Sequence, residues 1–197
     1  MSAPEELTPE LLLYAYSHGL FPMGDEDGEI YWYDPDPRAI MPLDSIHVPR
    51  SLARRIRKGG FEVRVDTVFR RVIAACAEPR PDQGTWITPP IIDIYCELHR
   101  LGYAHSVETW IDDELVGGLY GVTVGGLFAG ESMFSRATDS SKIALVHLVE
   151  RLVRGGFVLL DTQFMTEHLR RFGTVEIARE EYQRRLQVAL QIPAIFG

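Results

Sequence analysis

The segment from residue 104 to residue 163 constrains the fold most strongly, because its turns and apolar runs predict a continuous order of elements. Three largely apolar runs, 106–111, 114–124 and 127–134, are separated by Asp112-Asp113 and by Gly125-Gly126. Two-residue turns of Asp or Gly between such runs are typical of β-hairpins. We therefore expect a three-stranded antiparallel meander here.

A helix and a further strand are expected to complete this unit. Asp139, Ser140 and Ser141 mark a helix start, and Gly155-Gly156 marks its end. Between them the apolar stripe at helical spacing is Ala144, Leu145, Leu148, Val149 and Leu152. Residues 157–163 read as a buried strand whose last positions are polar. Because strand side chains alternate, Asp161 and Gln163 are expected on one face, at the end of a strand where sites often lie.

The rest of the chain predicts further elements around this unit. Thr8 and Pro9 favour a helix start, with an end near Gly19, and residues 20–49 look irregular. We expect a strand at 61–65, helices at 67–77 and 88–102, a short helical or irregular segment at 162–172, a last strand at 174–178 and a last helix at 179–190. From residue 104 the order is β-β-β-α-β-α-β-α. This order predicts an α+β fold, a mixed and mostly antiparallel sheet flanked by helices.

Composition and charge narrow the class of protein. The chain has 197 residues, two cysteines that form no C-x-x-C pair, no run long and apolar enough for a membrane span, and an acidic rather than an apolar N-terminus. A cytoplasmic globular protein is therefore expected. Nine of its 28 acidic residues lie within residues 1–37, which contain no Lys or Arg. The remaining 19 stand against all 20 basic residues, so the rest of the chain is nearly neutral.

One basic run has two interpretations. Residues 50–58 contain Arg50, Arg54, Arg55, Arg57 and Lys58. A solvated helix face would carry such charges, and a local phosphate-binding patch would carry them equally well. The sequence pattern leaves both open.

Several familiar motifs are excluded by their context. Gly130-Glu-Ser132 lacks the second glycine of a nucleophile elbow and falls within a strand, so a serine hydrolase is rejected. Gly117, Gly118 and Gly121 also lie within a strand, where they favour a bulge or a close backbone approach over a phosphate loop. The histidines lack the spacing of metal ligands, and we expect no metal site.

Seven segments together resemble one family. They are GLFP at 19–22, DPDPR at 34–38, GTWIT at 84–88, AHSVETW at 104–110, LVGGLYG at 115–121, GESMFS at 130–135 and SKIAL at 141–145. Collinear over about residues 7–190, they resemble leucyl/phenylalanyl-tRNA–protein transferase. That family transfers Leu or Phe from tRNA to the α-amino group of proteins that begin with Arg or Lys, which marks those proteins for degradation.

The resemblance implies a fold and a set of roles. It implies a small N-terminal domain, residues 1–60, before a catalytic domain, residues 61–197, that is similar to GCN5-related acetyltransferases. Gln163 resembles the residue that orients the amine, and Asp161 resembles its partner. Glu131 matches an essential acidic position, which we expect to bind the cationic end of the substrate because carboxylates pair well with guanidinium and ammonium groups.

The resemblance also implies where the aminoacyl-tRNA binds. The walls of the side-chain pocket would be Leu119, Phe128, Met133, Leu145, Leu148, Leu152 and Leu160, with Gly130 leaving room for the ligand. Leu148 and Leu152 stand where Phe is expected in the family, which would widen the pocket. Trp86 would stack on the terminal adenosine, while Met23 replaces a second expected Trp. The basic run at 50–58 would contact the acceptor stem, and no cofactor is implied.

Two other classes of protein are the alternatives. A GCN5-related acetyltransferase that uses acetyl-CoA would have a glycine-rich pyrophosphate loop between the meander and the helix, where this chain has SRATDSS at 135–141. A non-catalytic tRNA-binding module would need no Asp161 and Gln163 arrangement.

Overall fold

The computed structural model describes residues 7–25, 27–79 and 84–197. Its strands are β1 Phe21–Gly24, β2 Ile30–Tyr33, β3 Arg38–Met41, β4 Glu62–Val65, β5 Ala104–Ile111, β6 Glu114–Val124, β7 Leu127–Ser135, β8 Leu159–Gln163 and β9 Val175–Ile177. Its helices are α1 Pro9–Ser17, α2 Arg50–Lys58, α3 Phe69–Cys76, α4 Pro89–Arg100, α5 Ser140–Arg154, α6 Glu167–Arg170 and α7 Arg179–Ala189. Glu5, Glu6, Glu26 and part of the expected loop at 78–84 lie outside the described residues.

A seven-stranded mixed sheet forms the centre of the molecule, in the order β4-β5-β6-β7-β8-β3-β9. Every neighbouring pair is antiparallel except β7 and β8, which are parallel. The predicted meander is confirmed as β5, β6 and β7. Its turns use positive φ angles at Asp112, Asp113 and Gly125, the backbone conformation that Gly and Asp tolerate best. The predicted order of elements from residue 104, and with it the mixed α+β fold, is also confirmed.

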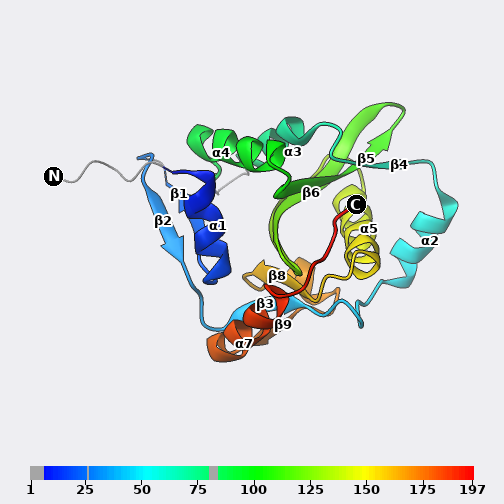
Figure 1. Cartoon of the computed structure of the whole chain (residues 1–197). Coiled ribbons are helices and arrows are strands. Elements are labelled where there is room, and N and C mark those ends of the chain that lie inside the picture. Colours follow the sequence, from blue (N-terminus) through cyan, green and yellow to red (C-terminus); the bar gives the residue numbers. More distant parts are fainter. Residues whose placement is uncertain (1–6, 26, 80–83) are drawn as a thin grey trace.

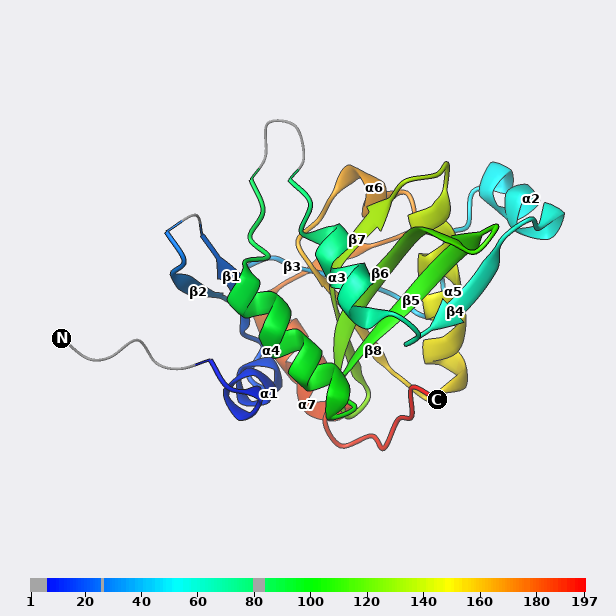
Figure 2. The same cartoon turned by 90° about the horizontal axis from the view of Figure 1, so that it is seen from above.

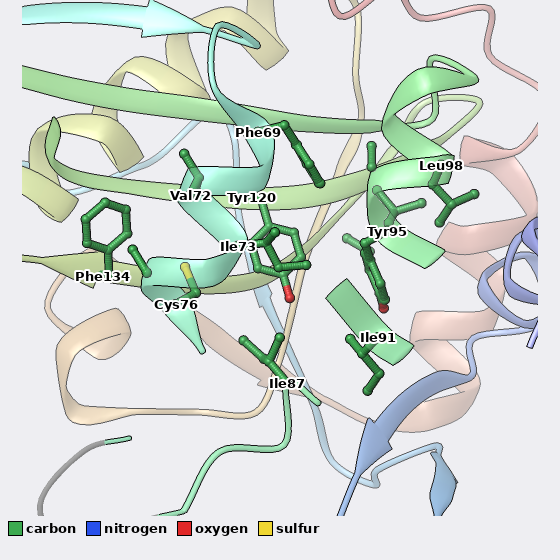
Figure 3. Close-up of a cluster of buried hydrophobic side chains, with 14 of the residues drawn as sticks. Phe69, Val72, Ile73, Cys76, Ile87, Ile91, Tyr95, Leu98, Tyr120 and Phe134 are labelled. Carbon is green, nitrogen blue, oxygen red and sulfur yellow. The ribbon is translucent and has the colours of Figure 1, made fainter. Parts of the chain in front are cut away.

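Helices cover both faces of this sheet (Figures 1 and 2). On one face α1, α3 and α4 pack a hydrophobic cluster around Tyr120 of β6. Figure 3 shows side chains of α3 and α4 gathered about that ring. On the other face α5 buries its predicted stripe. The helix α7 packs on the same face as α1, where Tyr182 and Leu186 cover β3 and β8 and where Gln183 donates a hydrogen bond to the carbonyl of His18. The site is built where these packed regions meet.

The expectation that residues 20–49 are irregular is wrong, because three short strands lie there. β1 and β2 pair with each other as a separate two-stranded sheet. β3 pairs with β8 on one side and with β9 on the other, so a strand from the first 60 residues lies inside the main sheet. The partners of β3 lie at least 119 positions away, so this four-residue strand has no local signature and is stabilised by tertiary pairing.

The glycines of β6 allow close packing, as their placement in a strand predicted. A Cβ atom on Gly121 would lie 2.3 Å from the carbonyl oxygen of Ala129, and one on Gly117 would lie 2.3 Å from Oγ of Ser140. Next to Gly121 the pairing of β6 with β7 shifts register, and Glu131 is the additional residue. Bulges of this kind redirect a side chain. This bulge places Glu131 at the candidate site.

Candidate active site

A cavity of about 690 Å³ opens where β7 and β8 diverge. The two parallel strands pair only from Leu127↔Leu159 to Ala129↔Asp161, although β7 continues to Ser135 and β8 to Gln163. Residues that follow the last pair on both strands line the cavity. The chain therefore holds a pocket of ligand size at the carboxyl ends of two parallel strands.

One wall of the cavity is apolar and contains most of the pocket residues expected from the sequence. They are Leu119, Met133, Leu145, Leu148 and Leu160, with Gly130 beside them. Within the described part of the chain, a Cβ atom on Gly130 would meet only the carbonyl oxygen of Asp161, at 3.4 Å. Among the described residues, Phe128 and Leu152 are not part of the lining. Both are fully buried behind it, and Phe128 stacks on Phe196 with 5.6 Å between the ring centroids.

Aromatic side chains border the same cavity. Trp86 lies on its lining together with Cys76 and Pro79. Phe164, directly after β8, also lines it and is 43% exposed. Its ring packs edge-on against Phe21 of β1, with centroids 5.6 Å apart. Met23 packs instead against the hydrophobic cluster under α1 and α4.

Glu131 lies on the cavity lining at the centre of a hydrogen-bonded network. Its Oε1 accepts from the hydroxyl of Tyr16 at 2.7 Å and from Nε2 of Gln163 at 3.0 Å, and its Oε2 accepts from the hydroxyl of Tyr95 at 3.3 Å. The two tyrosine hydroxyls also hydrogen-bond to each other. Burial raises the pKa of Glu131 to about 7, although the bonds from Tyr16 and Gln163 act in the opposite direction. The site thus contains a carboxyl group that titrates near neutral pH.

Asp161 and Gln163 are adjacent to the cavity but are not on its lining, where Leu160, Thr162 and Phe164 represent this segment. The side chain of Asp161 is buried against Arg38 and Tyr182. Gln163 has a φ of 62°, so it departs from the extended backbone on which the expected common orientation was based. The two residues are joined through the backbone, because the N–H of Gln163 donates to Oδ1 of Asp161 at 2.8 Å.

Comparison with known proteins assigns the family. A family model described as leucyl/phenylalanyl-tRNA protein transferase matches residues 40–187, and the model of the corresponding N-terminal domain matches residues 5–36. The chain belongs to the leucyl/phenylalanyl-tRNA–protein transferase family. The gap between the two matched regions, residues 37–39, includes the start of β3.

Full-length relatives of the same name agree with this assignment. The protein of that name from Herpetosiphon aurantiacus is 60% identical over 193 residues, which cover 98% of this chain and 99% of the relative. That from Gloeobacter violaceus is 58% identical over 191 residues, which cover 96% and 97%. This member of the family is therefore an enzyme, an aminoacyltransferase that uses leucyl- or phenylalanyl-tRNA. The assignment excludes the alternative of a non-catalytic tRNA-binding module.

The solved structures that match this chain are only distantly similar to it. L-PGS from Bacillus licheniformis matches 92% of this chain and 63% of that protein with a TM-score of 0.44 and 14% identity. A similarity of that size supports no inference about the site.

The basic run at 50–58 forms α2, which lies at the opposite end of the molecule from β1 and β2 in both views (Figures 1 and 2). Arg50, Arg54, Arg57 and Lys58 are exposed and form no ion pair within the described residues. Arg55 differs, because its guanidinium donates to the carbonyl of Gly59 and lies 5.5 Å over the ring of Phe61. Four of the five predicted residues are therefore free to meet an anionic partner.

The structure adds four residues to the site that were not predicted as site residues. Arg38 and Tyr182 bind Asp161, while Tyr16 and Tyr95 bind Glu131. Arg38 ends one of the segments that carry the family resemblance, which was the one signal for it. The tyrosines come from α1, α4 and α7, far apart in sequence, so no local pattern identifies them. No described helix is long and apolar enough to cross a bilayer, and no described cluster of His, Cys, Asp or Glu could hold a metal ion.

Proposed function

We propose that this enzyme transfers Leu or Phe from tRNA to the α-amino group of polypeptides that begin with Arg or Lys, as a step that creates a degradation signal in the cytoplasm. The observation that carries the proposal is the apolar cavity with Glu131 on its wall. A carboxyl group beside an apolar pocket provides for two ligands at once, an aliphatic or aromatic side chain and a cation.

The apolar wall is proposed to hold the aminoacyl side chain. Leu119, Met133, Leu145, Leu148 and Leu160 offer a surface without charges, and Gly130 adds space beside Asp161. Met is adaptable, which suits a pocket that accepts both a branched and an aromatic shape. Phe128 and Leu152 would then act from behind, by supporting the residues of the wall.

The chemistry needs a positioned amine more than a strong base, because the aminoacyl ester is already activated. The α-amino nitrogen attacks the ester carbonyl, a C–N bond forms, and the C–O bond to the terminal ribose breaks. The amine loses one proton and the ribose oxygen gains one. Nε2 of Gln163 donates a hydrogen bond to Glu131. Oε1 of the same Gln163 amide is proposed to accept a hydrogen bond from the attacking amine. Asp161 supports Gln163 through the bond to its backbone N–H.

Glu131 is proposed to bind the cationic side chain of the acceptor. A cation beside this carboxyl would favour the ionised form, which burial alone disfavours. Trp86 is proposed to stack on the terminal adenosine, and the exposed residues Arg50, Arg54, Arg57 and Lys58 of α2 to contact phosphates of the acceptor stem.

We also propose that the catalytic domain, residues 61–197, is similar in fold to GCN5-related acetyltransferases. This proposal is supported by the meander β5–β7, the helix α5, and the parallel strand β8 that diverges from β7 around the cavity.

A direct transfer assay tests the proposed function. The protein is mixed with radiolabelled leucyl-tRNA and a peptide that begins with Arg, and the label is followed into the peptide. Matched peptides that begin with Lys, with Glu, or with N-acetylated Arg serve as controls. We expect label on the Arg and Lys peptides alone. Equal labelling of the Glu peptide would contradict the proposed role of Glu131, and labelling of the acetylated peptide would contradict the α-amino acceptor.

A further inference from the structure

We propose that Arg38 and Tyr182 are positioning residues for the transfer reaction, because they hold Asp161 so that its carboxylate fixes the backbone of Gln163 and directs the Gln163 amide toward Glu131. The proposal rests on the proposed role of Gln163 in orienting the amine. It adds two residues from distant parts of the chain, β3 and α7, and it gives Asp161 the task of holding the backbone of Gln163 in place.

The carboxylate of Asp161 has all its acceptor sites occupied. Oδ1 accepts from Nε of Arg38 at 3.0 Å and from the backbone N–H of Gln163 at 2.8 Å. Oδ2 accepts from Nη2 of Arg38 at 2.6 Å and from the hydroxyl of Tyr182 at 2.8 Å. A carboxylate offers about four lone-pair sites. With four donors in place and a side chain 1% exposed, Asp161 has no site left for the amine of a substrate.

Arg38 is itself held firmly. Its remaining nitrogen, Nη1, donates to the carbonyl of Gly19 at 2.9 Å. The guanidinium carbon lies 4.8 Å from the ring centroid of Phe21 and 4.4 Å from that of Tyr182. A planar guanidinium bound at both oxygens of a carboxylate sets its orientation as well as its place. Arg38 therefore fixes the plane of the Asp161 carboxylate.

The next link is the backbone of Gln163. Its φ of 62° lies in the left-handed region, which is unfavourable for a residue with a Cβ atom and persists where neighbouring contacts stabilise it. The bond from its N–H to Oδ1 of Asp161 is such a contact. In this conformation the side chain is directed to Glu131, with Nε2 at 3.0 Å from Oε1. The chain of contacts thus runs from Arg38 and Tyr182 through Asp161 to the amide of Gln163.

Tyr182→Phe tests the proposal with little risk to folding, since it removes one of the four donors and keeps the ring that packs against Arg38. We expect kcat for transfer to fall roughly tenfold, with KM for aminoacyl-tRNA unchanged. In the Gln163→Ala background the same substitution should lower kcat no further, because its effect passes through Gln163. Equal losses in both backgrounds, or no loss in the first, would overturn the proposal. Arg38→Lys, which keeps the charge but not the paired donors, should lower kcat more strongly than Tyr182→Phe.

A spectroscopic readout separates this proposal from the proposed function. The side-chain NH₂ resonances of Gln163 are assigned by their loss in Gln163→Ala, and Tyr182→Phe should displace them. Two separate results are compared. If Tyr182→Phe displaces these resonances but Gln163→Ala leaves kcat unchanged, the proposed role of Gln163 fails and the positioning of its amide by Tyr182 stands. If the resonances do not move, the positioning proposal fails. Leu186→Val, one turn further along α7 in the same cluster, is the control, and it should lower Tm without changing kcat or the resonances.

Discussion

Nε2 of Gln163 donates a 3.0 Å hydrogen bond to Oε1 of Glu131, and this bond joins the end of β8 to the bulge of β7 across the opening between the two strands. It links the residue proposed to orient the amine to the residue proposed to bind the cation. Because both side chains come from the strands that form the cavity, substitutions at either one should change the rate of transfer.

Gln163→Ala should lower kcat for transfer by about 100-fold or more, while the affinity for aminoacyl-tRNA stays nearly constant, because the amide acts on the acceptor amine. Single-turnover transfer and filter binding measure the two quantities. Gln191→Ala, at an exposed glutamine after α7, is the matched control and should leave both unchanged. Undiminished transfer in Gln163→Ala would remove Gln163 from the reaction.

Leu148→Phe should shift the preference of the enzyme from Phe toward Leu. Leu148 lies on the cavity wall and is 1% exposed, so a larger side chain there takes space from the ligand. We expect the ratio of kcat/KM for leucyl-tRNA over phenylalanyl-tRNA to rise by about tenfold. Leu152→Met, on the same helix but behind the wall, conserves volume and should leave the ratio near its original value. A ratio that moves equally in both variants would place the preference elsewhere.

The raised pKa of Glu131 predicts a particular dependence of stability on pH. Burial moves its pKa from the usual value of about 4.3 to about 7. Between these values the folded state binds more protons than the unfolded state, so this group lowers the free energy of unfolding as pH rises through that range.

Glu131→Gln lacks this titration. The free energy of unfolding of the variant minus that of the parent enzyme should therefore rise from pH 5 to pH 8, by at most about 3 kcal/mol. Urea unfolding at both pH values measures the difference, and Glu150→Gln, at an exposed position of α5, provides the control. An unchanged difference between pH 5 and pH 8 would show that Glu131 titrates normally.

Replacing Arg54, Arg57 and Lys58 by Gln should weaken tRNA binding and flatten its salt dependence. Each lost phosphate contact should reduce the slope of log K against log salt concentration by about 0.7 to 0.9. A control triple replacement at Arg100, Arg184 and Arg185 removes the same charge from residues that already pair with Glu97 or Glu181. If the two triple variants show equal slopes of log K against log salt concentration, the basic face of α2 is a solvated surface that does not contact tRNA.

Much of this enzyme could be predicted without coordinates, for identifiable reasons. The meander β5–β7, the helix α5 and the strand β8 were predicted because turns at Asp112-Asp113 and Gly125-Gly126, and the pattern of apolar residues, act over short distances in sequence. Five of the seven expected wall residues line the cavity. Phe128 and Leu152 lie behind it, because a buried apolar residue looks the same in sequence whether it faces a ligand or the core.

By itself the sequence determined the order of elements from residue 104, the family, the place of Glu131 within one strand, and the place of Asp161 and Gln163 at the end of another. Tertiary structure alone decided that β3 enters the main sheet beside β8, and that Arg38, Tyr182, Tyr16 and Tyr95 surround those three residues. The physical reason is the range of the interactions. Turns and helical periodicity arise between near neighbours, whereas the ion pair and hydrogen bonds that these four residues make with Glu131 and Asp161 join groups separated in this chain by 21 to 123 residues.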